Sequence, residues 1–408
     1  MSKIIADALF PHITKTPAEF ETKYPPRAAA CTTRFAPSPT GFMHIGGLYT
    51  ALLNCLVARE KDGVFLLRIE DTDQKRQVEG GVSEIISSLR DFDIRFDEGP
   101  ANETEDYGGY GPYRQSLRRE IYQTYARDLV ERDLAYPCFC SEEELQALRE
   151  QQEQAGEPQK GYFGKWAVWR DQPDERVLEK LQAGEPYVIR QKIPREGVTG
   201  FDDMVYGHIE VNNSEMDDQI LIKTDGMPTY NFANVVDDHL MGITHVIRGS
   251  EYLSSTPKYN LLYQAFGWEI PTYIHCPPVM KDAQNKLSKR NGDASYEDLI
   301  AAGYLKEAVL NYIALLGWSP GGEQEVFTLP ELVQAFDISG ISKSPSIFDT
   351  NKLRWLNGEY IRRLSPEAFY DMAKPWLDKG IHSDSIDRRA VAALLQAPLE
   401  DLQRTEGI

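Results

Sequence analysis

The first strong pattern of apolar and polar positions along the chain predicts a strand, a helix and a second strand. Residues 31–36 (CTTRFA) have the composition of a strand, and apolar side chains then recur at helical spacing from 48 to 57. Gly63 stands where this helix should end, and the mostly apolar run 64–70 (VFLLRIE) suits a buried parallel strand. This order predicts a right-handed strand–helix–strand unit, in which ligands lie at the carboxyl ends of the strands.

The remaining chain predicts an inserted domain, a return to strands and a helical end. Residues 117–213 combine an acidic helical stretch, a Tyr- and Trp-rich piece and strand-like runs, which is typical of an insertion. Residues 1–30 form a short terminal arm to which the pattern assigns no role. Further strand-like runs and then helical patterns follow at 219–225, 244–251, 305–318 and 360–408.

Composition places the chain among ordinary globular proteins of two to four domains. It has 408 residues, of which 41% are hydrophobic and 26% charged. No apolar run approaches the roughly 20 residues that span a bilayer, so we expect no membrane segment. The N-terminus lacks a sustained apolar core, which argues against a secretory signal. The five cysteines form no disulfide framework, so we expect a reducing, cytoplasmic location.

Charge is unevenly distributed along the chain. The formal net charge of −19, taken alone, argues against a nucleic-acid partner. Two short strips have the opposite sign: 281–290 (KDAQNKLSKR) carries four positive side chains against one negative, and 114–119 (RQSLRR) carries three positive ones. An acidic body with basic strips can bind a polyanion at the strips and repel it elsewhere.

The stretch 35–48 (FAPSPTGFMHIGGL) is the first candidate for chemistry. Gly41 and Gly46 have the glycine spacing of a P-loop, but the lysine and hydroxyl residue that should follow are missing. The loop leads into a helix, whose first amide groups and positive dipole end attract anions. His44 can therefore be a phosphate donor at the mouth of the helix, or simply a surface histidine beside a helix start.

The second candidate is 286–290 (KLSKR), which is followed by the turn-like pair Asn291-Gly292. Alone, it could be a solvated basic turn. Together, the His-Gly loop and this loop resemble the two signatures of class I aminoacyl-tRNA synthetases. Five segments, the first of which contains the His-Gly loop, resemble bacterial glutamyl-tRNA synthetases in the right order between about 33 and 365: TRFAPSPTGFMHIGGLYTAL, LLRIEDTD, GPYRQS, PTYNFANVVDDHLMGITHVIRG and FDTNKLRWLNGEYI. Gly47 stands where the class-wide signature has a second histidine, as is usual in the glutamyl branch.

The resemblance implies an α/β fold with a Rossmann-type parallel-sheet catalytic domain that carries an inserted α+β acceptor-binding domain. A helical stem-contact domain and the start of a helical anticodon-binding domain should follow. The chain ends soon after the NGEYI segment, so we expect an incomplete anticodon module. The expected units are an extension (1–32), the catalytic domain (33–116 and 214–267), the insertion (117–213), the stem-contact domain with the KLSKR loop (268–360) and the anticodon part (361–408).

The resemblance also implies the site residues. Two arginines suit the two carboxylates of glutamate, and an acidic side chain suits its ammonium group. The glutamate site maps onto Arg34, Ala36, Ser38, Glu70, Tyr230, Asn234 and Arg248. The ATP site maps onto His44, Gly46, Gly47, Glu251 and Lys289, and the implied catalytic residues are His44, Lys286 and Lys289.

The implied reaction has two transfers. ATP, with Mg²⁺, activates L-glutamate to glutamyl-adenylate, and the 2′-hydroxyl at the 3′ end of tRNA(Glu) then takes the glutamyl group. The attacking carboxylate is already ionised, so positioning and charge stabilisation carry the first step. A monomer is implied, and whether tRNA(Gln) is also charged stays open.

We expect no bound zinc, and no catalytic metal held by the side chains of 237–245. Some relatives hold zinc through a C-x-C pair, and Cys138 and Cys140 form such a pair. No Cys or His lies between 141 and 207, however, and a tetrahedral site needs about four ligands. Residues 237–245 (DDHLMGITH) are interpreted as structural.

Two other functions compete with tRNA charging. One is a tRNA-modifying glutamyl transferase of the same fold, which lacks the anticodon part and has a degraded lysine loop. The other is a catalytically inactive tRNA-binding paralogue. The intact KLSKR and FDTNKLRWLNGEYI segments argue against the first, and the intact residues Arg34, His44, Glu70, Arg248 and Lys289 argue against the second.

Overall fold

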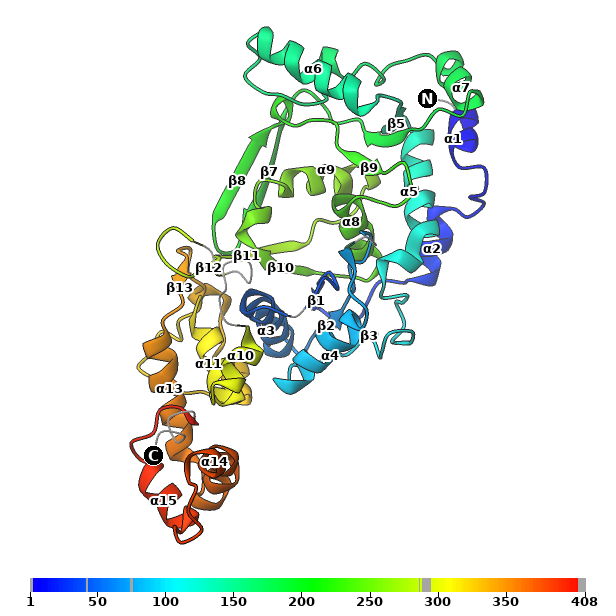
Figure 1. Cartoon of the computed structure of the whole chain (residues 1–408). Coiled ribbons are helices and arrows are strands. Elements are labelled where there is room, and N and C mark those ends of the chain that lie inside the picture. Colours follow the sequence, from blue (N-terminus) through cyan, green and yellow to red (C-terminus); the bar gives the residue numbers. More distant parts are fainter. Residues whose placement is uncertain (1–2, 42, 74–75, 286, 288–294, 403–408) are drawn as a thin grey trace.

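The predicted strand–helix–strand unit is confirmed in a computed structural model, which describes residues 3–41, 43–73, 76–285, 287 and 295–402. Strand β1 (Thr32–Phe35) pairs in parallel with β2 (Val64–Leu67), and α3 (Ile45–Glu60) connects them (Figure 1). The register places Arg34 opposite Leu66. A second helix, α4 (Gly81–Asp91), follows β2.

A second parallel pair continues this layer. Strands β10 (His245–Gly249) and β11 (Thr272–Cys276) are joined by α9 (Thr256–Phe266). The amide of Thr244, just before β10, donates to the carbonyl of Thr32 at 3.0 Å, which sets β10 beside β1. Helix α3 contacts β1, β2 and β10 from one face, and α8 (Tyr230–Leu240) and α9 lie on the other (Figure 1).

Alternation along β1 explains this layered arrangement. Successive side chains of a strand point to opposite faces. The Thr33 hydroxyl donates to the Asn54 carbonyl of α3 at 2.8 Å, whereas the guanidinium of Arg34 reaches Asp238 on α8 at 2.9 Å. One short strand therefore ties together helices that lie on the two faces of the sheet.

The inserted region builds its own antiparallel sheet. Strand β6 (Val188–Gln191) lies between β5 (Ala135–Cys138) and β9 (Ile220–Ile222). Helices α5, α6 and α7 accompany this sheet: Arg119–Glu131, Glu142–Gln154 and Asp174–Gln182.

Strand pairing crosses the predicted boundary at 213/214 in both directions. Strands β7 (Val198–Asp203) and β8 (Gly207–Asn212) lie before the boundary, yet they extend the sheet of β10 and β11 through β7. Strand β9 lies after the boundary and completes the sheet of the insertion. The domain boundaries themselves stay a prediction.

The N-terminal arm is packed against the body. It contains α1 (Lys3–Leu9) and α2 (Pro17–Lys23), which contact α5. Its apolar side chains, among them Phe20, are buried in one hydrophobic cluster with α5, α8 and α9. Arg27 then forms a bidentate ion pair with Glu98. Burying apolar area in this way stabilises an arm that could not hold its fold alone.

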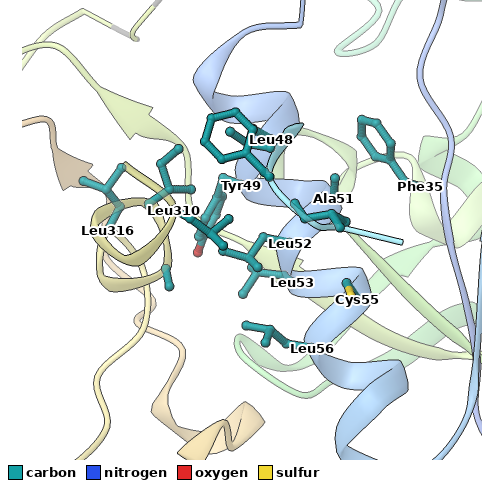
Figure 2. Close-up of a cluster of buried hydrophobic side chains, with 14 of the residues drawn as sticks. Phe35, Leu48, Tyr49, Ala51, Leu52, Leu53, Cys55, Leu56, Leu310 and Leu316 are labelled. Atoms are coloured by element: carbon teal, nitrogen blue, oxygen red, sulfur yellow. The ribbon is translucent and has the colours of Figure 1, made fainter. Parts of the chain in front are cut away.

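The largest hydrophobic cluster surrounds α3. This helix is apolar on all sides, which is typical of a buried helix. Leu52, Leu53 and Leu56 are fully buried, and Figure 2 shows Leu310 and Leu316 packing beside α3 from a neighbouring segment. The core therefore fixes the helix whose N-terminus follows the His-Gly loop.

The C-terminal region is helical, as predicted, and lies at the opposite end of the molecule from α6 and α7 (Figure 1). Among the described residues, no helix is long and apolar enough to cross a membrane. The helices α10 to α15 are Tyr296–Ala301, Lys306–Leu315, Leu329–Ala335, Thr350–Arg363, Pro366–Gly380 and Arg388–Leu395. Short strand pairs complete the fold: β3 (Gly99–Pro100) with β4 (Asp106–Tyr107), and β12 (Val279–Met280) with β13 (Ser346–Ile347).

Candidate active site

His44 is the N-cap of α3. Its ring Nδ1 accepts the backbone amide of Gly47 at 3.0 Å, which satisfies one of the amides that a helix start leaves without an internal partner. Because Nδ1 is an acceptor, the proton of the neutral ring lies on Nε2, which is then a donor. A side chain at either glycine would crowd this helix start: an added Cβ would lie 3.1 Å from Nδ1 of His44 at Gly46 and 3.3 Å from the Met43 side chain at Gly47.

Two adjoining cavities open beside this helix start. The first, of about 250 Å³, lies between the carboxyl ends of β1, β10 and β11, and the second, of about 500 Å³, lies along the loop after β1. They share the residues Phe35, Ala36, His44, Gly47, Tyr230 and Tyr252. The edge of the sheet thus holds one continuous site with two compartments.

The predicted residues are divided between the compartments. Arg34, Gly46, Arg248 and Glu251 line the first cavity only. Ser38 and Glu70 line the second cavity only. The backbone explains the second group, because the Glu70 amide donates to the carbonyl of Pro37 at 2.9 Å and so holds the segment after β2 beside the loop.

A buried ion network supports the site from the α8 side. One oxygen of Asp238 accepts from Nε of Arg34 at 2.9 Å and from Nη1 of Arg68 at 2.7 Å. The amide oxygen of Asn234 accepts from the same two arginines, at 3.2 Å each. All of these side chains are at most 3% exposed. Burial opposes the charge of Asp238, but the two guanidinium groups outweigh it and lower the pKa of Asp238.

A second acidic residue of α8 extends this network. Asp237 forms a 2.6 Å ion pair with Arg118, and it accepts from Gln115 at 2.9 Å and from the hydroxyl of Tyr122 at 2.8 Å. Arg68 lies 3.8 Å from the same carboxylate. The network therefore ties α8 to the end of β2 and to the start of α5.

Glu70 is a carboxyl group whose charge changes near neutral pH. Burial raises the pKa of Glu70 to about 7, against the lowering effect of Arg68 and Arg34. Arg68 donates to Glu70 at 3.1 Å. Near neutral pH this carboxyl responds to a nearby charge, and a cationic group in the second cavity would favour its ionised form.

Arg248 presents a cation to the first cavity. It is 5% exposed, and its Nη1 has no hydrogen-bond partner among the residues that the structure describes. A buried guanidinium nitrogen without a partner is costly, so a ligand that supplies an anionic oxygen there gains binding energy. The arrangement suits a small anion beside a phosphate-binding helix start.

Comparison with known proteins agrees with this geometry. Residues 30–355 match the family described as tRNA synthetases class I (E and Q), catalytic domain. The chain belongs to this family. It is 57% identical over 371 residues to the glutamate–tRNA ligase of Clostridium botulinum, covering 91% of this chain and 74% of the relative. It is 60% identical over 348 residues to the glutamate–tRNA ligase of Clostridium novyi, covering 85% of this chain and 69% of the relative.

Solved structures of the same family have the same fold. A crystal structure of a glutamate tRNA ligase from Elizabethkingia meningosepticum, in complex with its amino acid, aligns with a TM-score of 0.84 at 36% identity. The alignment covers 92% of this chain and 78% of that one. The class I synthetase fold therefore extends over most of the chain.

Within the family fold, most of the predicted site residues lie together. Asn234 lines neither cavity and instead holds the two arginines behind them. Lys286 and Lys289 lie outside the described residues. Leu287, which stands between them in the chain, lines the first cavity, and its amide donates to the carbonyl of Val279 at 3.1 Å.

Sequence reasoning missed Arg68 as part of the network and treated Asp238 as structural only. A signal for Arg68 existed, because an arginine inside the apolar run VFLLRIE should be buried, and a buried charge needs a partner. Its partners in the structure are Asp237 and Asp238, which are neighbours in the sequence of α8. Tyr252, whose ring lies 5.4 Å from that of Tyr230, had no such signal.

The C-x-C pair does not fit a zinc site within the described residues. Cys138 is buried, and Sγ of Cys140 lies 3.5 Å from the hydroxyl of Tyr162. Across the described part of the chain, no three His, Cys, Asp or Glu side chains cluster in a way that could hold a metal ion. Two thiols fall short of the four ligands of a tetrahedral site.

Replacing Asp238 with asparagine should destabilise the fold. The Asp238→Asn variant keeps the side-chain shape but leaves Arg34 and Arg68 buried without their shared counter-charge. We expect a loss of about 3–5 kcal/mol in the free energy of unfolding, measured by urea denaturation. Asp171→Asn, in an exposed surface pair with Lys192, is the control and should leave the value unchanged. A loss in Asp238→Asn no greater than in the control would show that the network is not structural.

Proposed function

We propose that the chain is a glutamate–tRNA ligase, which joins L-glutamate to tRNA in two steps driven by ATP. The observation that carries the proposal is the buried cation of Arg248, which lines a cavity beside the His44 helix start and whose Nη1 has no hydrogen-bond partner in the described part of the chain. A dicarboxylic amino acid and a nucleotide phosphate are the ligands that this combination suits. The 57% identity to a glutamate–tRNA ligase over 91% of the chain supports the same function.

In the proposed glutamate site, each charged group of the substrate pairs with a side chain of opposite charge. Arg34 and Arg248 bind the two carboxylates, and Glu70 binds the ammonium group. Ala36, Ser38 and Tyr230 complete the walls, and Asn234 keeps Arg34 in place. Neutral amino acids lose one ion pair in such a site, which favours glutamate over them.

In the proposed activation step, an oxygen of the substrate carboxylate attacks the α-phosphorus of ATP. The bond to the bridging oxygen breaks, pyrophosphate leaves, and glutamyl-adenylate forms. His44 with the Gly46–Gly47 backbone contacts the phosphates, Glu251 lies near the nucleotide, and Lys286 and Lys289 stabilise the departing pyrophosphate. Mg²⁺ enters as the partner of the ATP phosphates. The nucleophile is already ionised, so no general base is needed.

In the proposed transfer step, the 2′-hydroxyl of the tRNA 3′ end attacks the carbonyl carbon of the adenylate. AMP leaves and an ester forms, and the hydroxyl proton passes to the solvent or to the departing phosphate. A Rossmann-type catalytic domain carries the reaction, the insertion binds the acceptor end, and the helical C-terminal part contacts the stem and begins the anticodon module. We expect a cytoplasmic monomer that acts on tRNA(Glu).

A charging assay tests the function directly. The protein, ATP, [¹⁴C]glutamate and whole tRNA should give an acid-precipitable product whose label is released by mild alkali, because the bond is a ribose ester. Label that survives alkali would instead indicate glutamate on an internal base, as in the tRNA-modifying alternative. No product with intact tRNA would contradict both enzymatic functions.

Glutamate binding should strengthen as pH rises through the titration of Glu70. Only the ionised carboxylate attracts the substrate ammonium, and the pKa of Glu70 is about 7, so roughly one tenth of the free protein is competent at pH 6 and nine tenths at pH 8. The dissociation constant of glutamate should therefore fall about tenfold between these pH values, as measured by isothermal titration calorimetry.

The matched variant for this titration is Glu70→Gln, which keeps the shape and removes the charge. It should bind glutamate weakly and with a flat profile from pH 6 to pH 8. If Glu70→Gln keeps the slope of the unmodified protein, another group titrates and Glu70 does not bind the ammonium group.

A further inference from the structure

Arg248 is held in a different way from the other arginines of the site. Arg34 and Arg68 form ion pairs with Asp238, but no carboxylate among the described residues pairs with Arg248. Burial of a lone cation is normally strongly unfavourable. Something other than a direct counter-ion must therefore keep this guanidinium charged and in place.

Two neutral acceptors hold the guanidinium of Arg248. Nε donates to Nε2 of His275 at 3.1 Å, and Nη2 donates to the hydroxyl oxygen of Thr256 at 2.9 Å. That hydroxyl in turn donates to the carbonyl of Tyr252 at 2.8 Å, so its oxygen is turned toward Arg248. Aromatic rings surround the cation at centroid distances of 4.6 to 5.6 Å, which adds cation–π stabilisation from Tyr252, Tyr259 and Tyr273.

The hydrogen bond from Arg248 determines which ring nitrogen of His275 carries the proton. Because Nε2 accepts from a guanidinium, which never gives up its proton, the neutral ring must carry its proton on Nδ1. Nδ1 lies 2.7 Å from Oδ2 of Asp203, and both side chains are fully buried. Burial lowers the pKa of His275, and the charge of Arg248 acts in the same direction against the raising effect of Asp203. His275 is thus a neutral bridge between a carboxylate and a cation.

The carboxylate of Asp203 is itself anchored by backbone. Its Oδ1 accepts the amides of Val205 and Tyr206 at 2.9 Å each, and its Oδ2 also accepts the amide of His275 at 3.1 Å. Asp203 is the last residue of β7 and pairs with Tyr273 on β11. The orientation of Arg248 is therefore set by the strand register, through Asp203 and then His275.

We propose that Asp203 and His275 are positioning residues that hold Arg248 as an uncompensated cation beside the first cavity, where it binds a substrate carboxylate. A carboxylate in direct contact with Arg248 would neutralise it and compete with the substrate. The imidazole instead transmits orientation and only part of the negative charge. This role deepens the proposed glutamate site and rests on that function for the identity of the anion.

Steady-state kinetics of His275 variants test the proposal. His275→Phe keeps a ring but removes the acceptor, so the KM for glutamate should rise about tenfold or more while the KM for ATP stays within twofold. His275→Gln places an amide oxygen near the position of Nε2 and should restore most of the glutamate KM. His245→Phe is the matched control on the neighbouring strand and should change neither KM.

A spectroscopic measurement tests the relay without any variant. In ¹⁵N-labelled protein, the His275 ring should show a protonated Nδ1 and an unprotonated Nε2 at pH 7.5. The opposite tautomer would overturn the relay, as would a glutamate KM within twofold of normal in His275→Phe, or an equal rise in both KM values. If the unmodified protein binds glutamate calorimetrically but charges no tRNA, the proposed function fails while the relay stands.

Discussion

The carboxylate of Asp238 is the interaction on which the rest of the site depends. It lies between two guanidinium groups, one on β1 and one just after β2. Its own helix, α8, follows in the sequence after the long insertion that separates it from both strands. Asp238 is the counter-charge that both buried guanidinium groups share, so its loss would leave both of them short of an ion partner. The pairing therefore sets the distance from α8 to the sheet, and with it the places of Tyr230 and Asn234. Asp237 forms a second buried ion pair, with Arg118, which holds α8 against the start of α5.

Against this neutralised background, Arg248 differs, because no carboxylate of the described residues pairs with it. Its guanidinium is held by a neutral imidazole, a hydroxyl and aromatic rings. The difference separates Arg34 and Arg68, which share their charge with Asp238, from Arg248, whose charge is left for a ligand. Glu70 provides the opposite charge in the second cavity. Burial raises its pKa to about 7, so a bound cation can shift it to the ionised form near neutral pH. Between them, the His44 helix start offers donors to phosphate.

The local parts of this arrangement could be predicted from sequence, because they depend on neighbouring residues. Apolar periodicity was enough for β1, α3 and β2, and the proline- and glycine-rich loop pointed to a site at the start of α3. The family resemblance then named Arg34, Glu70 and Arg248. No apolar pattern in residues 1–30 was strong enough to predict that the N-terminal arm is buried against the body.

The parts that escaped prediction depend on distant residues. Asp203 and His275 are 72 residues apart, and only the pairing of β7 with β11 brings them together. Arg68 and Asp238 are 170 residues apart and meet only when α8 packs on the sheet. The exchange of β7 and β9 across the expected domain boundary has the same origin, because strand partners are chosen by the assembled sheet.

The most direct test of Arg248 as the carboxylate anchor is a crystal structure of this chain with L-glutamate bound. We predict a substrate carboxylate oxygen within hydrogen-bond distance of Arg248 Nη1, with the bond from Arg248 Nε to His275 retained. A bound glutamate whose carboxylates both pair elsewhere, with Arg248 Nη1 still lacking an anionic partner, would contradict this assignment.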